Sequence, residues 1–275
     1  MIDKEKELFE YLKKLGRVAV AFSGGVDSTY LLYSAAAALG EENVLAVMTE
    51  AQCVPRHESA EAIKLARDSG VRLRVCRLDQ LSIPGFAENP EDRCYICKHA
   101  LFETMIGIAK EEGFGAMCDG TNLSDEGDFR PGMRALAELS VVSPLKECGF
   151  TKDDIRFYSR LHGLPTWDKA SFACLASRFP TGERITDDKL LMVEKGEDLL
   201  RRTGFTQYRV RIIERGGDGA GRYAASIELL PEEFDLYRRH EKEITDFLTE
   251  AGFAEISLDP DGYCTGKMNE KTKTG

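Results

Sequence analysis

The stretch VAVAFSGGVDSTYLLYSA, from Val18 to Ala35, decides the fold of this chain. It begins with an apolar run, Val18–Phe22, in which no polar residue alternates. Such a run predicts a strand that is buried on both faces of a sheet. The residues from Ser28 to Leu39 predict a helix, which ends at Gly40. The turn between strand and helix therefore holds a glycine pair flanked by hydroxyl and carboxylate side chains, more polar groups than a plain connection requires.

This turn predicts a phosphate-binding loop. Ligands of parallel α/β sheets bind at the carboxyl ends of the strands, where glycines let backbone N–H groups approach a phosphate and the next helix N-terminus attracts it. Its spacing is neither the Walker P-loop nor the dinucleotide fingerprint. A carboxylate at Asp27 fits an anion site only if a cation shares it, so we expect Mg²⁺ there. A strand-to-helix turn capped by Ser or Asp is the plain structural alternative. The predicted phosphate-binding residues are Ser23, Gly24, Gly25, Asp27, Ser28 and Thr29.

Strands and helices alternate on both sides of this loop. Further strands are predicted at residues 44–48, 71–78, 116–119 and 139–142, and further helices at 4–16, 56–69, 98–112 and 151–162. This order predicts an α/β fold with a doubly wound, mostly parallel sheet and helices on both faces. Gly120 and Thr121 follow one of the strands, so we expect them beside the loop at the same edge of the sheet.

The pattern changes after about residue 184. The order becomes helix 186–202, strands 205–213 and 223–230, helix 231–250 and strand 253–258. We therefore predict a phosphate-loop domain over residues 1–184 that also carries a cysteine site. A smaller C-terminal α+β domain over 185–262 would serve substrate binding or oligomerisation, and a tail over 263–275 is predicted to be disordered.

Composition narrows the class of protein. The chain has 275 residues, of which 43% are hydrophobic and 31% charged, as in soluble globular proteins. Its net charge of −10 argues against a nucleic-acid partner, because phosphate contacts require clustered Lys and Arg. No apolar run approaches the roughly 20 residues that span a bilayer, and the N-terminus lacks a secretory apolar core. We expect a cytoplasmic protein without a membrane partner.

Three of the eight cysteines are candidates for chemistry. Cys94 and Cys97 form a C-x-x-C that we expect just before a helix, and Cys174 lies in SFACLASRF. The first interpretation is an iron–sulfur cluster on all three thiolates with one iron open. The second is a zinc site with His99 or His57 as fourth ligand. The third is a reactive Cys174, with the other two as bystanders or a redox pair. A plain structural role is the remaining alternative.

Two arginines in YRVRIIE predict a second anion site. The strand period of two places Arg209 and Arg211 on one face. Two neighbouring guanidinium groups suit a phosphate monoester, and an exposed strand face is the alternative.

The glycine loop resembles the S-G-G-x-D-S loop of the ATP pyrophosphatase superfamily, which includes GMP synthetase, NAD synthetase, asparagine synthetase and tRNA thiolation enzymes. The resemblance implies an adenine nucleotide alpha-hydrolase-like fold and ATP bound by the loop, by Gly120 and by Thr121. It also implies adenylation of a substrate oxygen with release of pyrophosphate. The loop does not name the acceptor.

Further motifs are similar to those of the LarE family, ATP-dependent sulfur transferases that build the nickel-pincer nucleotide of lactate racemase. They are AFSGGVDSTYLL, RCYICKHALF, DGTNLSDEGDFRPGMRA, SPL and ACLASRFPTGERIT. The similarity extends over residues 8–260. It implies adenylation of the carboxylates of pyridinium-3,5-biscarboxylic acid mononucleotide, their conversion to thiocarboxylates, and a homo-oligomer. Arg209 and Arg211 would then bind the phosphate of the mononucleotide.

The resemblance implies two sulfur sources. In one, Cys174 surrenders its own sulfur and becomes dehydroalanine. In the other, Cys94, Cys97 and Cys174 hold a [4Fe–4S] cluster whose open iron carries a sulfide, and the presence of all three cysteines favours this form.

Three other functions remain as alternatives. They are a tRNA thiolation enzyme, for which a basic face would be expected, a synthetase without sulfur chemistry, and an ATP-binding sensor without turnover.

Overall fold

A computed structural model of the chain describes residues 2–125, 131–170, 173–215 and 222–264. The chain divides into two compact units. The first comprises Met1–Ile83 and Asp92–Ser171, and the second comprises Pro84–Glu91 and Phe172–Gly275. Of the predicted tail, residues 265–275 lie outside the described part of the chain.

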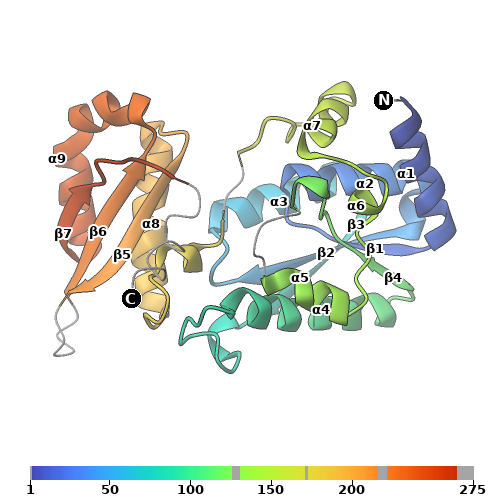
Figure 1. Ribbon diagram of the computed structural model, residues 1–275, viewed down its shortest axis with the longest axis horizontal. Coiled ribbons are helices and arrows are strands. Elements are labelled where there is room, and N and C mark those ends of the chain that lie inside the picture. The colour runs from blue at the N-terminus through green and yellow to red at the C-terminus, as the bar shows by residue number, and fades with distance from the viewer. Residues whose placement is uncertain (1, 126–130, 171–172, 216–221, 265–275) are drawn as a thin grey trace. The chain divides into compact units, whose positions relative to one another are not determined.

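The first unit is built on a four-stranded parallel sheet with the strand order β3-β2-β1-β4 (Figure 1). Val18 of β1 pairs with Val44 of β2 on one side and with Ala116 of β4 on the other. Its strands are β1 (Val18–Ala21), β2 (Val44–Ala51), β3 (Arg72–Leu78) and β4 (Ala116–Cys118).

Helices cover both faces of this sheet. The helices of the unit are α1 (Ile2–Leu15), α2 (Val26–Leu39), α3 (Arg56–Asp68), α4 (Arg93–Glu111), α5 (Pro131–Glu138), α6 (Pro144–Glu147) and α7 (Lys152–Leu161). In Figure 1, α2 and α3 lie on one side of the sheet and α4 and α5 on the other. Val18 and Val20 pack into the cluster formed with α1, α2 and α7, whereas Ala19 packs with Phe102 of α4. The doubly wound α/β fold is thereby confirmed.

The predicted strand at 139–142 is wrong. Val142 makes a single parallel bridge with Cys118, in which its N–H donates to Met117 and its carbonyl accepts from Asp119. Ser143 then leads into Pro144 at the start of α6. Proline has no N–H to extend a ladder, so the pairing ends after one residue.

Helix α4 begins earlier than the predicted residue 98. The carbonyl of Asp92 accepts hydrogen bonds from the N–H groups of Tyr95 and Ile96, which starts the helix at Arg93. Cys94 and Cys97 therefore lie inside its first two turns, and the expectation that they precede a helix is corrected.

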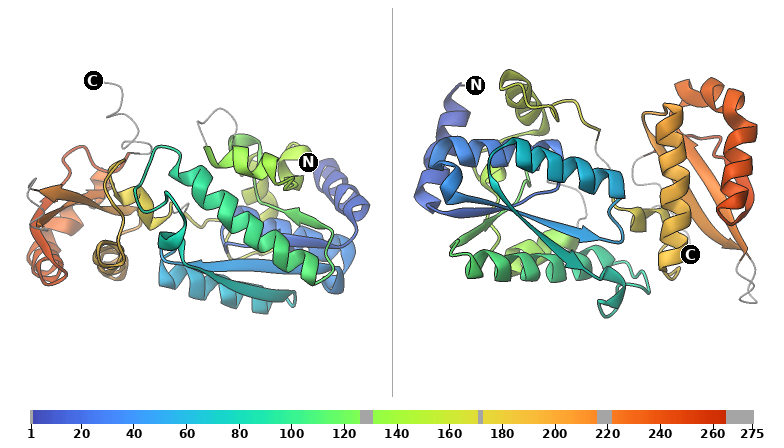
Figure 2. Two further views of the ribbon diagram at one scale, coloured as in Figure 1. Left: turned by 90° about the horizontal axis from the view of Figure 1, so that it is seen from below. Right: turned by 180° about the vertical axis from the view of Figure 1, so that it is seen from behind.

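The second unit has the predicted α-β-β-α-β order. Its elements are α8 (Asp187–Thr203), β5 (Tyr208–Arg215), β6 (Arg222–Leu229), α9 (Phe234–Glu250) and β7 (Phe253–Leu258). The sheet order is β5-β6-β7, with β5 and β6 antiparallel and β6 and β7 parallel. Figure 2 shows both helices along one face of this sheet.

The second unit begins before the predicted boundary at residue 184. The segment Pro84–Glu91 also belongs to the second unit, although the residues on both sides of it in the sequence belong to the first. The N–H of Gly182 donates to the carbonyl of Asn89, and the N–H of Ile185 donates to that of Ala87. These nonlocal bonds join the residues just before α8 to the segment Pro84–Glu91, and a change of sequence pattern does not reveal them.

Short 3₁₀ helices complete both units. They are η1 (Glu41–Asn43), η2 (Gln80–Ser82), η3 (Leu123–Asp125), η4 (Leu175–Arg178) and η5 (Pro231–Glu233). Among the described helices, none combines the length and apolarity needed to cross a membrane.

Candidate active site

The predicted phosphate loop connects β1 to α2, and hydrogen bonds of its own serine side chains fix its shape. The hydroxyl of Ser28 donates to the carbonyl of Gly25 at 3.2 Å and lies 3.1 Å from the hydroxyl of Ser23. Ser28 is buried, whereas Ser23 is exposed and accessible to a ligand. The N–H groups of Ser23 and Gly25 donate inside the loop, to the hydroxyl of Ser28 at 3.3 Å and to that of Ser23 at 3.4 Å. The loop thus places an exposed hydroxyl beside the N-terminus of α2, a combination that suits an anion.

Gly24 lets this loop pack directly against α3. Its φ of +70° is in the left-handed region that favours glycine. A Cβ at this position would lie 2.7 Å from the Cβ of Ala62. Any other residue at position 24 would therefore be strained in its backbone and would displace the helix.

Asp27 is the centre of a polar cluster drawn from separate parts of the first unit. The ammonium of Lys152 donates to its carboxylate at 2.5 Å, and the amide of Asn122 donates at 3.4 Å. Gly120 approaches so closely that a Cβ there would lie 3.1 Å from the Cβ of Asp27. Burial raises the pKa of the Asp27 carboxyl, although Lys152 opposes the shift. The expectation that Gly120 lies beside the loop agrees with this packing.

Thr121 has a different environment from its neighbour Gly120. Its hydroxyl donates at 2.5 Å to the carboxylate of Asp119, which also accepts a hydrogen bond from Ser143 at 2.6 Å. All three groups hold the end of β4 in shape. An ATP contact by the Thr121 side chain stays a prediction.

Thr29 lies on another side of α2. Its side chain is 8% exposed and lines a cavity beside α2 and α3. Its hydroxyl has no hydrogen-bond partner within the part of the chain that the structure describes. A direct phosphate contact by Thr29 therefore also stays a prediction.

Two lysines complete the surroundings of the loop and were missed in the sequence. Lys152, at the first position of α7, follows the N-cap Thr151. A positive charge at a helix N-terminus is unfavourable, because the helix dipole is positive at that end. Such a local conflict often marks a functional position, so the sequence did contain a signal for Lys152. Lys169 lies 2.7 Å from Glu58 and 3.0 Å from Glu61, and its ammonium donates to the carbonyl of Gly24 at 3.4 Å.

The charge of Lys169 is maintained by its partners. Burial disfavours the ammonium, but the carboxylates of Glu58 and Glu61 outweigh burial and raise the pKa of Lys169. Its backbone is also fixed, because Arg156 donates to the carbonyls of Trp167 and Lys169. No pattern in the sequence predicts that Lys169 lies beside the phosphate loop.

Cys94 and Cys97 belong to the first unit. They are one helical turn apart on α4, so they share a face. Cys94 is exposed and Cys97 is half-buried, with the amide of Gln80 donating to the sulfur of Cys97 at 3.1 Å. The described residues contain no group of three or more His, Cys, Asp or Glu side chains arranged to hold a metal ion. This unit therefore carries two of the three thiols predicted to hold a cluster.

Cys174 belongs to the second unit and is exposed. It is the N-cap of η4, whose last residue, Arg178, is fully buried. The guanidinium of Arg178 donates to both carboxylate oxygens of Glu197 at 2.7 Å. It also donates to the carbonyls of Ala173 at 2.7 Å and Cys174 at 3.0 Å. The exposed thiol therefore belongs to a turn whose backbone carbonyls are held by the buried guanidinium of Arg178.

Arg209 and Arg211 lie on one face of β5, as predicted, but this face is covered. They are 3% and 7% exposed. Arg211 donates to both oxygens of Glu228 at 3.1 and 3.0 Å and to the carbonyl of Ser177. Burial and the nearby Arg178 lower the pKa of Arg209. Arg211 thus helps to hold the Cys174 turn, and its binding of a substrate phosphate stays a prediction.

Comparisons with known proteins identify the family of this chain. The NAD synthase family profile matches residues 3–87, which include the phosphate loop. The uncharacterized protein slr1717 of Synechocystis is 36% identical over 97% of both chains. A subunit of the glutamine-hydrolyzing GMP synthase of Methanococcus maripaludis is 26% identical over 88% of this chain and 90% of its own. The pyridinium-3,5-bisthiocarboxylic acid mononucleotide synthase of Lactiplantibacillus plantarum is 34% identical over 97% of this chain and 94% of its own. The chain therefore belongs to the LarE family, that of the pyridinium-3,5-bisthiocarboxylic acid mononucleotide synthases.

Proposed function

We propose that this chain is an ATP-dependent sulfur transferase of nickel-pincer cofactor biosynthesis. It adenylates the carboxylates of pyridinium-3,5-biscarboxylic acid mononucleotide and converts them to thiocarboxylates. The observation that carries this proposal is the pairing of two sites in one LarE-family chain. One is the phosphate loop around Asp27 and Lys152, and the other is the exposed Cys174 on an anchored turn. The name of the Lactiplantibacillus plantarum relative supplies the product.

The first step is adenylation. An oxygen of the substrate carboxylate attacks the α-phosphorus of ATP, and the bond from that phosphorus to the pyrophosphate oxygen breaks. The backbone N–H groups of the loop and the exposed Ser23 hydroxyl bind the departing phosphates, and Lys152 offsets their negative charge. A carboxylate is a poor acyl donor, whereas the acyl-adenylate carries AMP as a good leaving group, so activation makes the second step feasible.

Magnesium fits the loop through Asp27. Proteins usually hold Mg²⁺ with one or two carboxylates together with substrate phosphates, so one carboxylate beside ATP is a sufficient protein contribution. When bound, the ion supplies charge neutralisation on the transferring phosphoryl group. Lys152, which pairs with Asp27 in the structure, then becomes available to the phosphates.

The second step is sulfur transfer from Cys174. Its thiolate attacks the acyl carbon, and AMP leaves with the electron pair of the broken C–O bond. Loss of the Cα proton of Cys174 and cleavage of its Cβ–Sγ bond then release the thiocarboxylate and leave dehydroalanine. The exposure of Cys174 and the anchoring of its backbone by Arg178 favour this residue as the donor.

A [4Fe–4S] cluster held by Cys94, Cys97 and Cys174 would be the alternative sulfur source. The two accessible cysteines on one face of α4 fit the requirement for thiolates, and Cys174 would supply the third. Such a cluster would deliver sulfide from its open iron.

The chain would act in the cytoplasm as a homo-oligomer and serve the maturation of lactate racemase.

Chemical analysis of the protein purified without oxygen tests the sulfur source. A brown protein with about four irons and acid-labile sulfide per chain would establish the cluster form. A colourless, iron-free protein whose mass falls by one H₂S after turnover would establish Cys174 as the sacrificial donor. Failure to release pyrophosphate with the biscarboxylic mononucleotide and ATP would refute the proposed function itself.

A further inference from the structure

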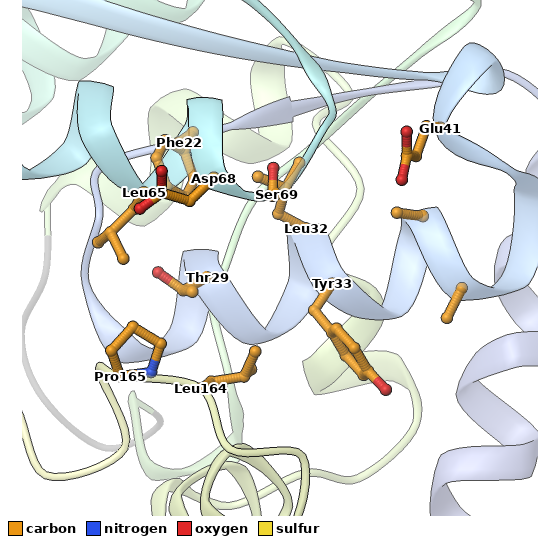
Figure 3. A pocket seen from close by; sticks show the side chains of 12 residues that line it. Phe22, Thr29, Leu32, Tyr33, Glu41, Leu65, Asp68, Ser69, Leu164 and Pro165 are labelled. Carbon is orange, nitrogen blue, oxygen red and sulfur yellow. The ribbon is translucent and has the colours of Figure 1, made fainter.

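A cavity of about 450 Å³ opens beside α2, on a side of the helix that the proposed reaction does not use. One wall is a stripe of α2 residues three to four apart, which is the spacing of one helix face. The facing wall comes from the C-terminal end of α3 and from the segment after α7 (Figure 3). Its lining includes Thr29, Leu32, Ala36, Glu41, Leu65, Asp68 and Leu164. Its volume lies within the range of about 300–1,000 Å³ that is usual for small-molecule sites.

The hydroxyl of Thr29 is an unused hydrogen-bonding group in this cavity. Thr29 is 92% buried, since its exposed fraction is 8%, and its oxygen has no partner among the described residues. Figure 3 shows the hydroxyl leaving α2 on the side that faces α3. The other hydroxyls of the cavity are engaged, since Ser69 donates to Ala66 at 2.8 Å and Tyr33 bonds to His162 at 3.0 Å. A buried polar atom without a partner in a roomy cavity is a position where a ligand can supply the missing bond.

Two carboxylates give the cavity a sign of charge. Glu41 and Asp68 both line it and are exposed at the surface. Asp68 pairs with Lys64 at 2.6 Å, but both side chains are solvated, so this pair holds them weakly. No lysine or arginine belongs to the lining among the residues that the structure describes. A cationic ligand group is therefore favoured over an anionic one.

We propose that this cavity is a binding site for a small aromatic amine. The ring would pack between Leu32, Leu65 and Leu164. A hydroxyl or carbonyl at one end would bond to Thr29, and the ammonium at the other end would face Asp68 and Glu41. Phe22 and Thr29, at the two ends of the phosphate loop, line the cavity, whereas residues 23–28 are not part of its described lining, so the cavity adjoins the loop but extends away from it along α2.

Tyramine is the probe that carries all three features, namely a phenol hydroxyl, a ring and an ethylammonium. Titration of the ¹⁵N-labelled full chain should shift the amide signals of residues 29–37 with a Kd of about 1 mM, as expected for a ligand of this size. Two truncated probes test the polar ends on the unchanged protein. Both 2-phenylethylamine, which lacks the hydroxyl, and 4-ethylphenol, which lacks the ammonium, should bind at least about threefold more weakly.

Variants separate this site from nonspecific binding. Ala36→Phe fills the cavity and should abolish the tyramine shifts. Asp68→Asn should weaken tyramine about threefold. Asp246→Asn is its matched control, because Asp246 also pairs with a lysine four residues earlier, Lys242, at 2.6 Å, and should change nothing.

The proposal is overturned by an absence of shifts in α2 up to about 10-fold above the expected Kd. Equal binding by Ala36→Phe, or 4-ethylphenol that binds as tightly as tyramine, would also overturn it. The readout is binding to the free protein, so the result does not depend on ATP or on sulfur transfer.

Discussion

Arg178 and Glu197 form a buried ion pair with two hydrogen bonds of 2.7 Å, and the same guanidinium holds the carbonyl of Cys174 at 3.0 Å. The residue that carries the exposed thiol is thus hydrogen-bonded through its backbone to a fully buried guanidinium. Coulombic attraction and hydrogen bonding by Glu197 outweigh burial and raise the pKa of Arg178, so its positive charge persists throughout the range in which enzymes work. The pair holds the backbone of Cys174 through this carbonyl.

Glu197→Gln should destabilise the protein by about 3–5 kcal/mol, because it leaves Arg178 buried without a counter-charge. Denaturant unfolding measures this loss. Asp198→Asn on the same helix is the control, since Asp198 pairs with Arg201 and Arg202 at the surface and should cost less than about 1 kcal/mol. Thiocarboxylate formation should also fall more than pyrophosphate release, because the phosphate loop belongs to the other unit. Equal losses in both would contradict the positioning role.

Cys174→Ala should uncouple the two half-reactions. Adenylation requires no sulfur, so pyrophosphate should still be released during the first turnover while no thiocarboxylate forms. Quantifying both products in a single-turnover assay tests this. Cys264→Ser replaces another exposed cysteine of the same unit and should leave both products unchanged. Thiocarboxylate formed by Cys174→Ala would exclude Cys174 both as donor and as a required cluster ligand.

Lys152→Gln should slow pyrophosphate release about 10- to 100-fold, because a charged hydrogen bond to the phosphates is lost. Asp153→Asn, next to Lys152 but exposed, serves as the control for altering the first turn of α7.

Asp27→Ala should abolish pyrophosphate release, because the contribution of the chain to Mg²⁺ binding is lost. Near-normal release by Asp27→Ala would show that the loop does not hold ATP as proposed.

Gly24→Ala should cost more stability than Gly16→Ala, although both glycines have a positive φ, at +70° and +74°. Nothing lies within 4 Å of a Cβ at Gly16, so its substitution reports the backbone cost alone, about 1–2 kcal/mol. At Gly24 the contact with Ala62 adds an overpacking cost of about 1–3 kcal/mol. Thermal or denaturant unfolding of both variants measures the difference. Equal costs would mean that α3 does not press on the loop.

Asp27 should make stability fall as pH rises through the acid range. Burial raises its folded-state pKa above the ordinary value of 3.8, so the folded protein binds this proton more tightly than the unfolded chain. Its contribution to stability is present below pH 3.8 and is lost as pH rises through the folded-state pKa. Asp27→Asn removes this component and should be more stable than the parent chain at neutral pH. Unfolding free energies measured from about pH 3 to 7 test the sign, and an unchanged pH profile in Asp27→Asn would refute it.

The local features of this protein could be predicted from its sequence. The loop after Val18–Phe22, the alternating strands and helices and the C-terminal α-β-β-α-β unit all depend on short-range patterns of apolar, glycine and capping residues. The motifs around the loop and Cys174 likewise depend on neighbouring residues. Because such patterns act within one or two turns or strands, one sequence suffices to read them.

Long-range partners were decided only by the tertiary structure. Lys152 is 125 residues from Asp27, and Lys169 is 145 residues from the Gly24 carbonyl that it contacts. The single bridge of Val142 and the surroundings of the Thr29 hydroxyl also depend on neighbours distant in the chain. A sequence pattern states which face a residue occupies, but the charge or hydroxyl it meets there is set by packing between elements. The phosphate loop can therefore be recognised in the sequence, whereas the contacts that Lys152 and Lys169 make with it and the anchoring of Cys174 by Arg178 arise only when the chain folds.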